Sequence, residues 1–295
     1  MRSATPHPNN AAIVGRVAAI GRDTGRGFIS RARPLVAVLR GLLSFPQNAM
    51  PRLSLSRRQV DLWCVSVDRI AEPSLWDAYR DLLSPDERER EQRFTCDEAH
   101  RNFLAARALL RTVLSRYTGI EPRRLEFRCN HFGKPSLRGH GDIPIEFSLS
   151  HTRGLVVCAV TLQDLVGVDA EGARRRSSPM ELARRYFSPA EAARVAERPT
   201  DERHAVFLDY WTLKEAFTKA LGVGLSIPLA DFSFTLFGDD SATISFATPG
   251  QERPDQWQFH RLRLAPCYQV AVALRRPAAE RSEIVIRQTI PLADS

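Results

Sequence analysis

Lysine is almost absent from this sequence of 295 residues. Of its 42 basic residues only three are lysines, and these are Lys134, Lys214 and Lys219. Lysine places a compact, rotatable ammonium where arginine places a flat guanidinium, so the two are not interchangeable at a binding site. Two of the three lysines fall within one short segment and flank Glu215. Chance is the weaker explanation for this grouping, and the segment 211–222 is therefore the first candidate for a functional element.

Cysteines and long apolar runs are also scarce. The five cysteines are odd in number and widely spaced, and no CxxC occurs. Neither a zinc site nor a disulfide framework is therefore indicated, and a reducing cytoplasm is the simplest setting. No apolar run approaches the length of a membrane span, so no membrane partner is expected. With 43% hydrophobic residues, the chain is expected to form one or two domains with a sizeable core.

Acidic residues are scarce at the start of the chain. Residues 1–50 contain seven arginines and one acid, Asp23, which accounts for +6 of the total net charge of +8. The basic character therefore belongs mainly to this segment and is weak evidence that the folded part binds nucleic acid. Such a composition fits a transit peptide, a disordered arm, or a translation start placed upstream of the true one at Met50. We expect residues 1–50 to be a dispensable, poorly ordered extension.

The segment 211–222 predicts a helix with two distinct stripes. One stripe has the spacing of a buried face and contains Tyr210, Leu213, Phe217, Ala220 and Leu221. The other stripe, with a spacing of four residues, contains Trp211, Glu215 and Lys219. Lys214 flanks this second stripe. A Trp, a carboxylate and lysines aligned in this way indicate a binding surface.

The segment 166–172 predicts a strand with paired carboxylates. Alternate side chains of a strand share a face, so Gly167, Asp169 and Glu171 lie together. The absence of a side chain at Gly167 allows another element to approach the backbone closely. A solvated edge strand with two acids explains the pair equally well when it is taken alone. Together with Glu215, however, three carboxylates without a His or Cys partner suit Mg²⁺, and Lys219 would neutralise a phosphate beside the metal.

Three further groups of residues are candidates for binding an anionic ligand. Ser150 and His151 end a predicted strand, and phosphate contact explains them better than nucleophilic catalysis, because no nucleophile elbow is present. The turn that contains Lys134 and Pro135 would suit the nucleotide end of a ligand. A charge run on a helix is most often a solvated face. From the arginines of the charged stretch 87–101 we assign only Arg90 and Arg101 to binding.

The order of predicted elements indicates an internal duplication. A Ser-Pro helix start occurs at residues 84–85 and again at 188–189, and each is followed by a long helix and antiparallel strands. We expect an N-terminal subdomain at 51–162, a C-terminal subdomain at 163–276, and a peripheral tail at 277–295. Ligands prefer the junction between such halves.

Taken together, these motifs resemble the 4'-phosphopantetheinyl transferases, specifically the larger, surfactin-type class. The resemblance covers about residues 58–274 and is carried by FGKP (132–135), FSLSH (147–151), GVDAE (167–171) and WTLKEAFTKALG (211–222). Two positions depart from the family pattern. Ser148 stands where the family usually has Asn, and Glu87 stands where a basic residue is often found.

The resemblance implies an α+β fold of two similar α/β subdomains, related by pseudo-two-fold symmetry, with the active site in the cleft between them. It implies that coenzyme A and Mg²⁺ bind there and that Asp169, Glu171 and Glu215 hold the metal. Asp169, Glu215 and Lys219 are the expected catalytic residues, with Glu215 taking the proton of the acceptor serine. The expected contacts to coenzyme A are Arg90, Arg101, Lys134, Pro135, Ser150, His151, Lys214 and Lys219.

The implied reaction transfers the phosphopantetheine arm of coenzyme A to a serine of an apo carrier protein and releases 3',5'-ADP. The expected partner is therefore an acyl, peptidyl or aryl carrier protein, and the expected state is a monomer in the cytoplasm. Three rival interpretations remain. They are another Mg²⁺-dependent phosphoryl or nucleotidyl transferase that accepts a nucleoside triphosphate, a basic nucleic-acid-binding module, and a non-catalytic paralogue that only binds carrier proteins.

Overall fold

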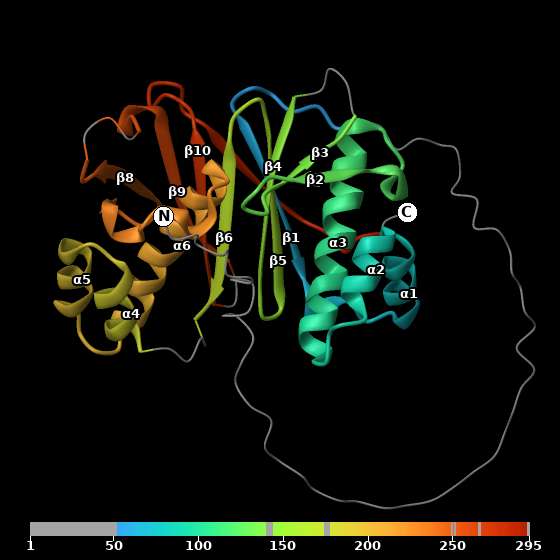
Figure 1. Ribbon diagram of the computed structural model, residues 1–295, viewed down its shortest axis with the longest axis horizontal. Helices are drawn as coiled ribbons and strands as arrows, with labels where there is room; N and C mark the ends of the chain where they lie inside the picture. Colours follow the sequence, from blue (N-terminus) through green and yellow to red (C-terminus); the bar gives the residue numbers. More distant parts are fainter. Residues whose placement is uncertain are drawn as a thin grey trace, which may run out of the picture. The chain divides into compact units, whose positions relative to one another are not determined.

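The computed structural model describes residues 52–139, 144–173, 178–248, 250, 252–264 and 267–293. The predictions for the basic segment 1–50 and for Met50 lie outside the described residues. The described residues form one compact unit, and its elements follow the chain in two similar series (Figure 1). No helix among the described residues is both long enough and apolar enough to cross a membrane. All five cysteines are free.

The first series contains three helices and five strands. Its elements are β1 (Gln59–Ser66), α1 (Pro73–Asp81), α2 (Pro85–Glu91), α3 (Asp97–Thr118), β2 (Phe127–Cys129), β3 (Pro135–Leu137), β4 (Ile145–Thr152) and β5 (Leu155–Leu162). The second series contains β6 (Val166–Gly172), α4 (Pro179–Tyr186), α5 (Pro189–Ala196), α6 (Arg203–Leu221), β7 (Phe232–Phe237), β8 (Ser241–Phe246), β9 (Trp257–Leu264) and β10 (Tyr268–Arg275). A last strand, β11 (Glu283–Gln288), follows.

The strands form two main sheets and one small one. The first sheet has the order β11-β1-β5-β4, the second has the order β6-β10-β9-β8-β7, and β2 pairs with β3. Within the first sheet β1 and β4 are both antiparallel to β5, and within the second β6 and β9 are both antiparallel to β10. Helices packed with mainly antiparallel sheets, in which only the β1–β11 pair among the described strands is parallel, thus confirm the predicted α+β class.

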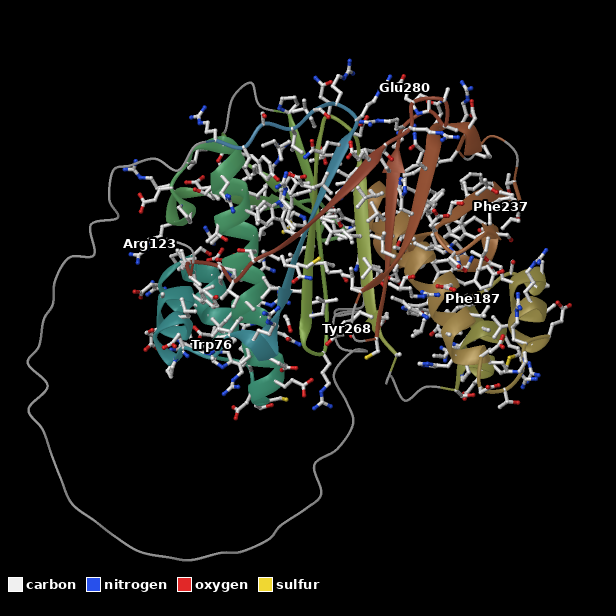
Figure 2. The ribbon with its side chains drawn as sticks, turned by 180° about the vertical axis from the view of Figure 1, so that it is seen from behind. Trp76, Arg123, Phe187, Phe237, Tyr268 and Glu280 are labelled. Atoms are coloured by element: carbon white, nitrogen blue, oxygen red, sulfur yellow. The ribbon has the colours of Figure 1, made fainter. Side chains whose placement is uncertain are left out.

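Three apolar clusters hold the layers together. One lies between the two sheets and is built from alternate residues of β1, β5, β6 and β10. Another lies between the first sheet and α3, and the third lies between the second sheet and α6. Trp76 of α1 and Phe187 at the end of α4 mark the two helical layers, on opposite sides of the sheets (Figure 2). Because β5 is covered on both faces, its residues are almost all buried, as its continuous apolar run predicts.

Both Ser-Pro segments begin helices as predicted. Ser84 caps α2 and Ser188 caps α5, and in each case proline occupies the start of the helix. Each serine side chain accepts a hydrogen bond from the backbone of the third helical residue, whose Glu side chain accepts one from the serine backbone. These capping boxes, with Glu87 and Glu191, satisfy backbone N–H groups that have no partner inside the helix.

The segment 277–295, expected to be a peripheral tail, instead completes the first sheet. β11 pairs with β1 in parallel, and Arg287 of β11 lies 3.0 Å from the buried carboxylate of Asp61. Further on, the Tyr79 hydroxyl donates to the Pro291 carbonyl oxygen at 2.9 Å. The expectation was wrong because strand pairing between residues more than 200 positions apart leaves no local pattern in the sequence.

Candidate functional site

The site begins with a close contact between β6 and α6 at Gly167. A Cβ atom placed on Gly167 would lie 1.9 Å from the Ala216 carbonyl oxygen and 2.4 Å from the Ala220 nitrogen. Any side chain here would therefore push the helix away from the strand. The predicted close approach at Gly167 is confirmed, and the element that approaches is α6, which carries Glu215 and Lys219.

A buried carboxylate, an ammonium and a hydroxyl meet beside this contact. The Lys219 ammonium donates to Asp169 Oδ1 at 2.6 Å and to Ser150 Oγ at 3.0 Å. The Ser150 hydroxyl in turn donates to the same Asp169 oxygen at 2.8 Å. Asp169 is 6% exposed, so these charge-assisted hydrogen bonds act where water screens them little. Three elements, β4, β6 and α6, thus converge on one carboxylate.

The second oxygen of Asp169 has no partner. Asp169 Oδ2 is buried and makes no hydrogen bond, which is costly for a carboxylate unless a cation or donor binds it. Glu171 lies on the same face of β6, and Glu215 lies one helical turn before Lys219; both are half-buried. No three His, Cys, Asp or Glu side chains within the described ranges are gathered closely enough to form a metal site. The buried, unpartnered oxygen of Asp169 is nevertheless the kind of ligand that a hard divalent cation takes.

Hydroxyl groups of β4 join the two sheets beside the carboxylate. Ser148 Oγ accepts a hydrogen bond from the backbone nitrogen of Val168 at 3.0 Å. Ser150 Oγ accepts one from Ala170 and Thr152 Oγ1 accepts one from Gly172, both at 3.3 Å. We call these three contacts the hydroxyl ladder. They satisfy backbone groups on the open edge of β6, which replaces the pairing that a neighbouring strand would supply.

The hydroxyl ladder also explains one departure from the family pattern. At position 148 a serine oxygen accepts the Val168 hydrogen bond, which is a role that an Asn side-chain oxygen can also perform. The replacement therefore leaves the edge of β6 satisfied. At position 87, the Glu87 side chain completes the capping box of α2. It also accepts a hydrogen bond from Arg111 of α3, whose Nη2 lies 2.7 Å from Glu87 Oε2.

Several positive charges lie near His151, the residue after Ser150 on β4. His151 is exposed at the surface, but the protein atoms packed around it and the nearby positive charges of Lys219, Arg107 and Arg90 all lower its pKa. The negative charge of Asp169 acts in the opposite direction. An anion bound beside the imidazole would offset these positive charges and raise the pKa of His151 again.

Arg107 is a candidate site residue that the sequence interpretation did not include. Arg107 and Arg90 both lie over the ring of Phe103, at 5.5 and 5.6 Å from its centroid. Burial lowers the pKa of Arg107, and the positive charges of Arg90 and Arg111 lower it further, although Glu87 raises it. Its buried Nε has no hydrogen-bond partner. The available indication was an arginine one turn after Phe103 and one turn before Arg111, on the same side of the helix.

Arg101 lies apart from this group. Its guanidinium is 5.7 Å from the centre of the Trp76 ring, and it lines a surface pocket of about 350 Å³ together with acidic residues of α3. None of its described contacts is to Ser150, Asp169 or Lys219. The next residue, Asn102, donates to the Thr152 carbonyl oxygen of β4, so the pocket of Arg101 lies at the end of this strand.

Lys134 and Pro135 lie at the far end of α6. The Lys134 ammonium donates to the Ala220 carbonyl oxygen at 2.7 Å and lies 3.9 Å from Glu146. Burial lowers the pKa of Lys134, and the carboxylate of Glu146 partly offsets this. Pro135 begins β3 and pairs with Cys129. The turn thus touches the helix that carries Lys219, and its lysine is engaged by the helix end.

Lys214 is fully buried in the second half and is not part of the site. Its ammonium donates to the carbonyl oxygens of Leu229 and Phe232 at 2.6 and 2.7 Å. It also lies 2.9 Å from Glu191, and its side chain is 0% exposed. This placement contradicts the predicted contact with coenzyme A. The helical wheel put Lys214 beside the Glu215 stripe, but β7 and α5 cover that side of the helix.

Comparison with known proteins identifies the family. A model described as "4'-phosphopantetheinyl transferase superfamily" matches residues 165–273, and one described as "4'-phosphopantetheinyl transferase, N-terminal" matches residues 71–163. The 4'-phosphopantetheinyl transferase HetI of Nostoc sp. is 37% identical over 177 residues, which are 60% of this chain and 74% of HetI. The 4'-phosphopantetheinyl transferase Sfp of Bacillus subtilis is 31% identical over 218 residues, which are 73% of this chain and 92% of Sfp.

This chain therefore belongs to the 4'-phosphopantetheinyl transferase family, and within it to the surfactin-type class. Among solved structures, a holo-[acyl-carrier-protein] synthase of Thermotoga maritima aligns with 38% of this chain and 62% of its own, at 24% identity and a TM-score of 0.30. That likeness is too weak to support a conclusion about the fold.

Proposed function

We propose that this protein transfers the 4'-phosphopantetheine moiety of coenzyme A to a serine of an apo carrier protein, and that 3',5'-ADP is released. Membership of the family gives the reaction class. The observation that carries the proposal for this chain is Asp169: a buried carboxylate with one oxygen held by Lys219 and Ser150, and the other without a partner. A carboxylate prepared in this way suits a cation bound to a pyrophosphate.

Mg²⁺ is the cation that this donor set would hold. Asp169 would bind it through Oδ2, with Glu171 from the same face of β6 and Glu215 from α6. When bound, the ion would neutralise charge on the pyrophosphate and polarise the phosphorus–oxygen bonds. Ser150 and Lys219 fix the Asp169 carboxylate, so that its free oxygen is presented in one orientation.

The positive side chains around β4 would bind the phosphates of coenzyme A. Lys219 would contact the pyrophosphate, since its ammonium lies beside the predicted metal ligand. His151 would contact a phosphate of the nucleotide. Arg90 and Arg107, which lie over one Phe103 ring, would contact the 3'-phosphate. Pro135 and the aliphatic part of Lys134 would lie beside the adenine.

The transfer itself requires a nucleophile, a base and a stabilised leaving group. The serine oxygen of the carrier attacks the phosphorus of the pantetheine phosphate, and the bond from that phosphorus to the oxygen of 3',5'-ADP breaks. Glu215 takes the serine proton, directly or through water. Lys219 stabilises the negative charge that develops on the departing oxygen. The carrier protein retains the phosphopantetheine arm as a phosphodiester.

The site is proposed to lie between two halves that arose by duplication. The strand orders β1-β5-β4 and β6-β10-β9 correspond, and a capping box begins both α2 and α5. We place the boundary after residue 162, so that β4 of the first half and β6 of the second form the walls of the site (Figure 1). Pseudo-two-fold symmetry of this kind supplies both walls from one chain, and a monomer is therefore sufficient.

Intact mass spectrometry of an apo carrier protein tests the proposal. The full chain, coenzyme A and Mg²⁺ should add one phosphopantetheine to the carrier, and a chelator should prevent this. A nucleoside triphosphate in place of coenzyme A should give no modification. Binding of coenzyme A without transfer to any acyl, peptidyl or aryl carrier would instead favour a non-catalytic paralogue. Failure to bind coenzyme A at all would overturn the proposal.

A further inference from the structure

The turn between β2 and β3 reaches from the first half of the chain to the end of α6. Asn130 Nδ2 donates to the Gly222 carbonyl oxygen at 2.6 Å. Lys134, at the other end of the turn, donates to the Ala220 carbonyl oxygen at 2.7 Å. We call this pair of hydrogen bonds the turn clamp. It joins residues 86 to 92 positions apart in the sequence.

The side chain of Asn130 shapes the turn as well as binding the helix. Its Oδ1 accepts hydrogen bonds from the backbone nitrogens of Phe132 and Lys134, both at 2.9 Å. The backbone of Asn130 adds two more bonds within the turn, to Gly133 and Lys134. The amide oxygen of Asn130 therefore stabilises the conformation of residues 130–134, while its amide nitrogen donates a hydrogen bond to the end of α6. One side chain performs two separable tasks.

The end of α6 is built to receive these two donors. The last carbonyl groups of a helix have no partner within it and carry partial negative charge. Gly222 ends α6 with φ 70°, in the left-handed region. A Cβ atom at Gly222 would lie 2.8 Å from Lys134 Cδ and 3.0 Å from Asn130 Nδ2. Glycine is thus needed here both for its conformation and for the space that the turn clamp occupies.

The helix held in this way is the one that carries the transfer chemistry. Lys219 directly precedes Ala220, whose carbonyl accepts the Lys134 hydrogen bond, and Glu215 lies one turn earlier on the same side. A shift of the helix end would therefore move the Lys219 ammonium relative to Asp169. The turn clamp and the Lys219–Asp169 contact lie at successive positions along the same helix.

We propose that Asn130 is a positioning residue, whose amide group couples the turn 130–134 to α6 and so holds Lys219 and Glu215 in place for coenzyme A. This inference rests on the proposed function. It differs from the sequence-based expectation for the turn, because its lysine acts on the helix end as well as lying beside the nucleotide. The residue itself does not touch the reacting atoms.

Two substitutions in the full chain separate the two tasks of Asn130. Asn130→Asp keeps an oxygen that accepts the hydrogen bonds of the turn, but it replaces the amide nitrogen that donates to Gly222 with a second oxygen. Asn130→Ala removes both the acceptor and the donor. Ser136→Ala, in the same hairpin but outside the turn clamp, is the matched control. The measurements are backbone hydrogen exchange, the dissociation constant of coenzyme A by calorimetry, and kcat and KM for coenzyme A and for the carrier protein.

Both Asn130 variants should increase hydrogen exchange at residues 222–223, and only Asn130→Ala should increase it at residues 132 and 134. For both, kcat/KM for coenzyme A should fall on the order of 10- to 100-fold, as expected for misplaced reacting groups, while the KM for the carrier protein stays within about twofold of the original. Ser136→Ala should resemble the unmodified protein in every measurement.

Two results would overturn the inference. Unchanged hydrogen exchange at residues 222–223 in Asn130→Asp would show that the side-chain amide of Asn130 does not stabilise the end of α6. Increased hydrogen exchange at residues 222–223, with unaltered kinetics and coenzyme A affinity, would show that the hydrogen bond from Asn130 stabilises the helix end but does not position the site. If the unmodified chain transferred no phosphopantetheine, the proposed function would fail, and exchange together with coenzyme A affinity would still decide whether Asn130 positions the site.

Discussion

The ammonium of Lys214 lies 2.9 Å from the carboxylate of Glu191, deep in the second half of the protein. The first half contains a counterpart, in which Arg111 lies 2.7 Å from Glu87. In both, the glutamate belongs to a capping box and the cation comes from the long helix. Arg111 also donates to two carbonyl oxygens, as Lys214 does. The two ion pairs fasten a short helix to a long one in the same way.

Replacement of Lys214 by methionine should destabilise the protein without a direct effect on coenzyme A. The buried Glu191 would lose its cation and two carbonyl oxygens would lose their donor, which costs about 3–5 kcal/mol for a broken buried pair. Urea unfolding measures this change. The double variant Lys214→Met with Glu191→Gln should recover part of the loss. Unchanged stability with a weakened affinity for coenzyme A would restore the sequence-based assignment.

Asp169→Asn should abolish transfer and leave the fold intact. The amide has nearly the shape of the carboxylate, but it cannot hold a divalent cation or balance the charge of Lys219. We expect the rate of carrier modification to fall at least about 100-fold. Circular dichroism and the thermal midpoint serve as the control for folding. A folded variant that retains near-normal turnover would remove Asp169 from the site.

Glu215→Gln should lower kcat by roughly 100-fold or more, because a glutamine can neither accept the serine proton nor bind Mg²⁺ well. Repeating the assay at high Mg²⁺ concentration distinguishes the two roles. Recovery at high concentration indicates a metal ligand, and loss of the acidic limb of the pH–rate profile without recovery indicates the base. Turnover close to that of the unmodified protein would exclude both roles.

Coenzyme A should bind more tightly as the pH falls through the range in which His151 titrates. In the free protein the pKa of His151 is lowered, first by loss of solvent around its ring, although the residue is exposed overall, and then by the charges of Lys219 and Arg107. A bound phosphate would raise that pKa, so binding takes up a proton, and affinity decreases as the pH rises between the two values. Calorimetry in buffers of different ionisation enthalpy measures the uptake. His151→Asn should remove it, and uptake that persists in this variant would exclude His151 as its source.

Deletion of residues 1–49 should leave both folding and transfer unaltered. The charge of this segment is the main source of the basic character of the chain, and the motifs of the site all lie beyond it. The shortened and full-length chains are compared by the rate of carrier modification and by thermal midpoint. A shortened chain that folds normally but transfers slowly would show that the segment takes part in recognition.

Local patterns in the sequence predicted the parts of the site that depend on local geometry. Period-two alternation put Gly167 and Asp169 on one face of β6, and the structure has both facing α6. The Ser-Pro starts predicted helices whose capping boxes are determined within four residues. In each case neighbouring residues suffice to fix the conformation.

Features that depend on distant residues could not be predicted in the same way. A helical wheel shows which residues share a side but not which element covers that side, and Lys214 was therefore misassigned. The partner of β11 is β1, more than 200 residues away. Arg107 was not singled out from the sequence, because its position beside Phe103 and Arg90 depends on how α2 packs against α3. The role of Asn130 likewise depends on a helix end some 90 residues further on.

The pairing of β11 with β1 has a consequence for the order in which the protein is made. A ribosome produces β5 well after β1, and β11 after the other described strands, so β1 lacks its second neighbour until the last part of the chain is made. Through that time one row of its backbone groups is open to pairing with another nascent chain. The Asp61 carboxylate also lacks its ion pair with Arg287 until β11 has been made. The first half of this protein is therefore finished last, and the yield of folded protein should depend on how well the growing chain is protected.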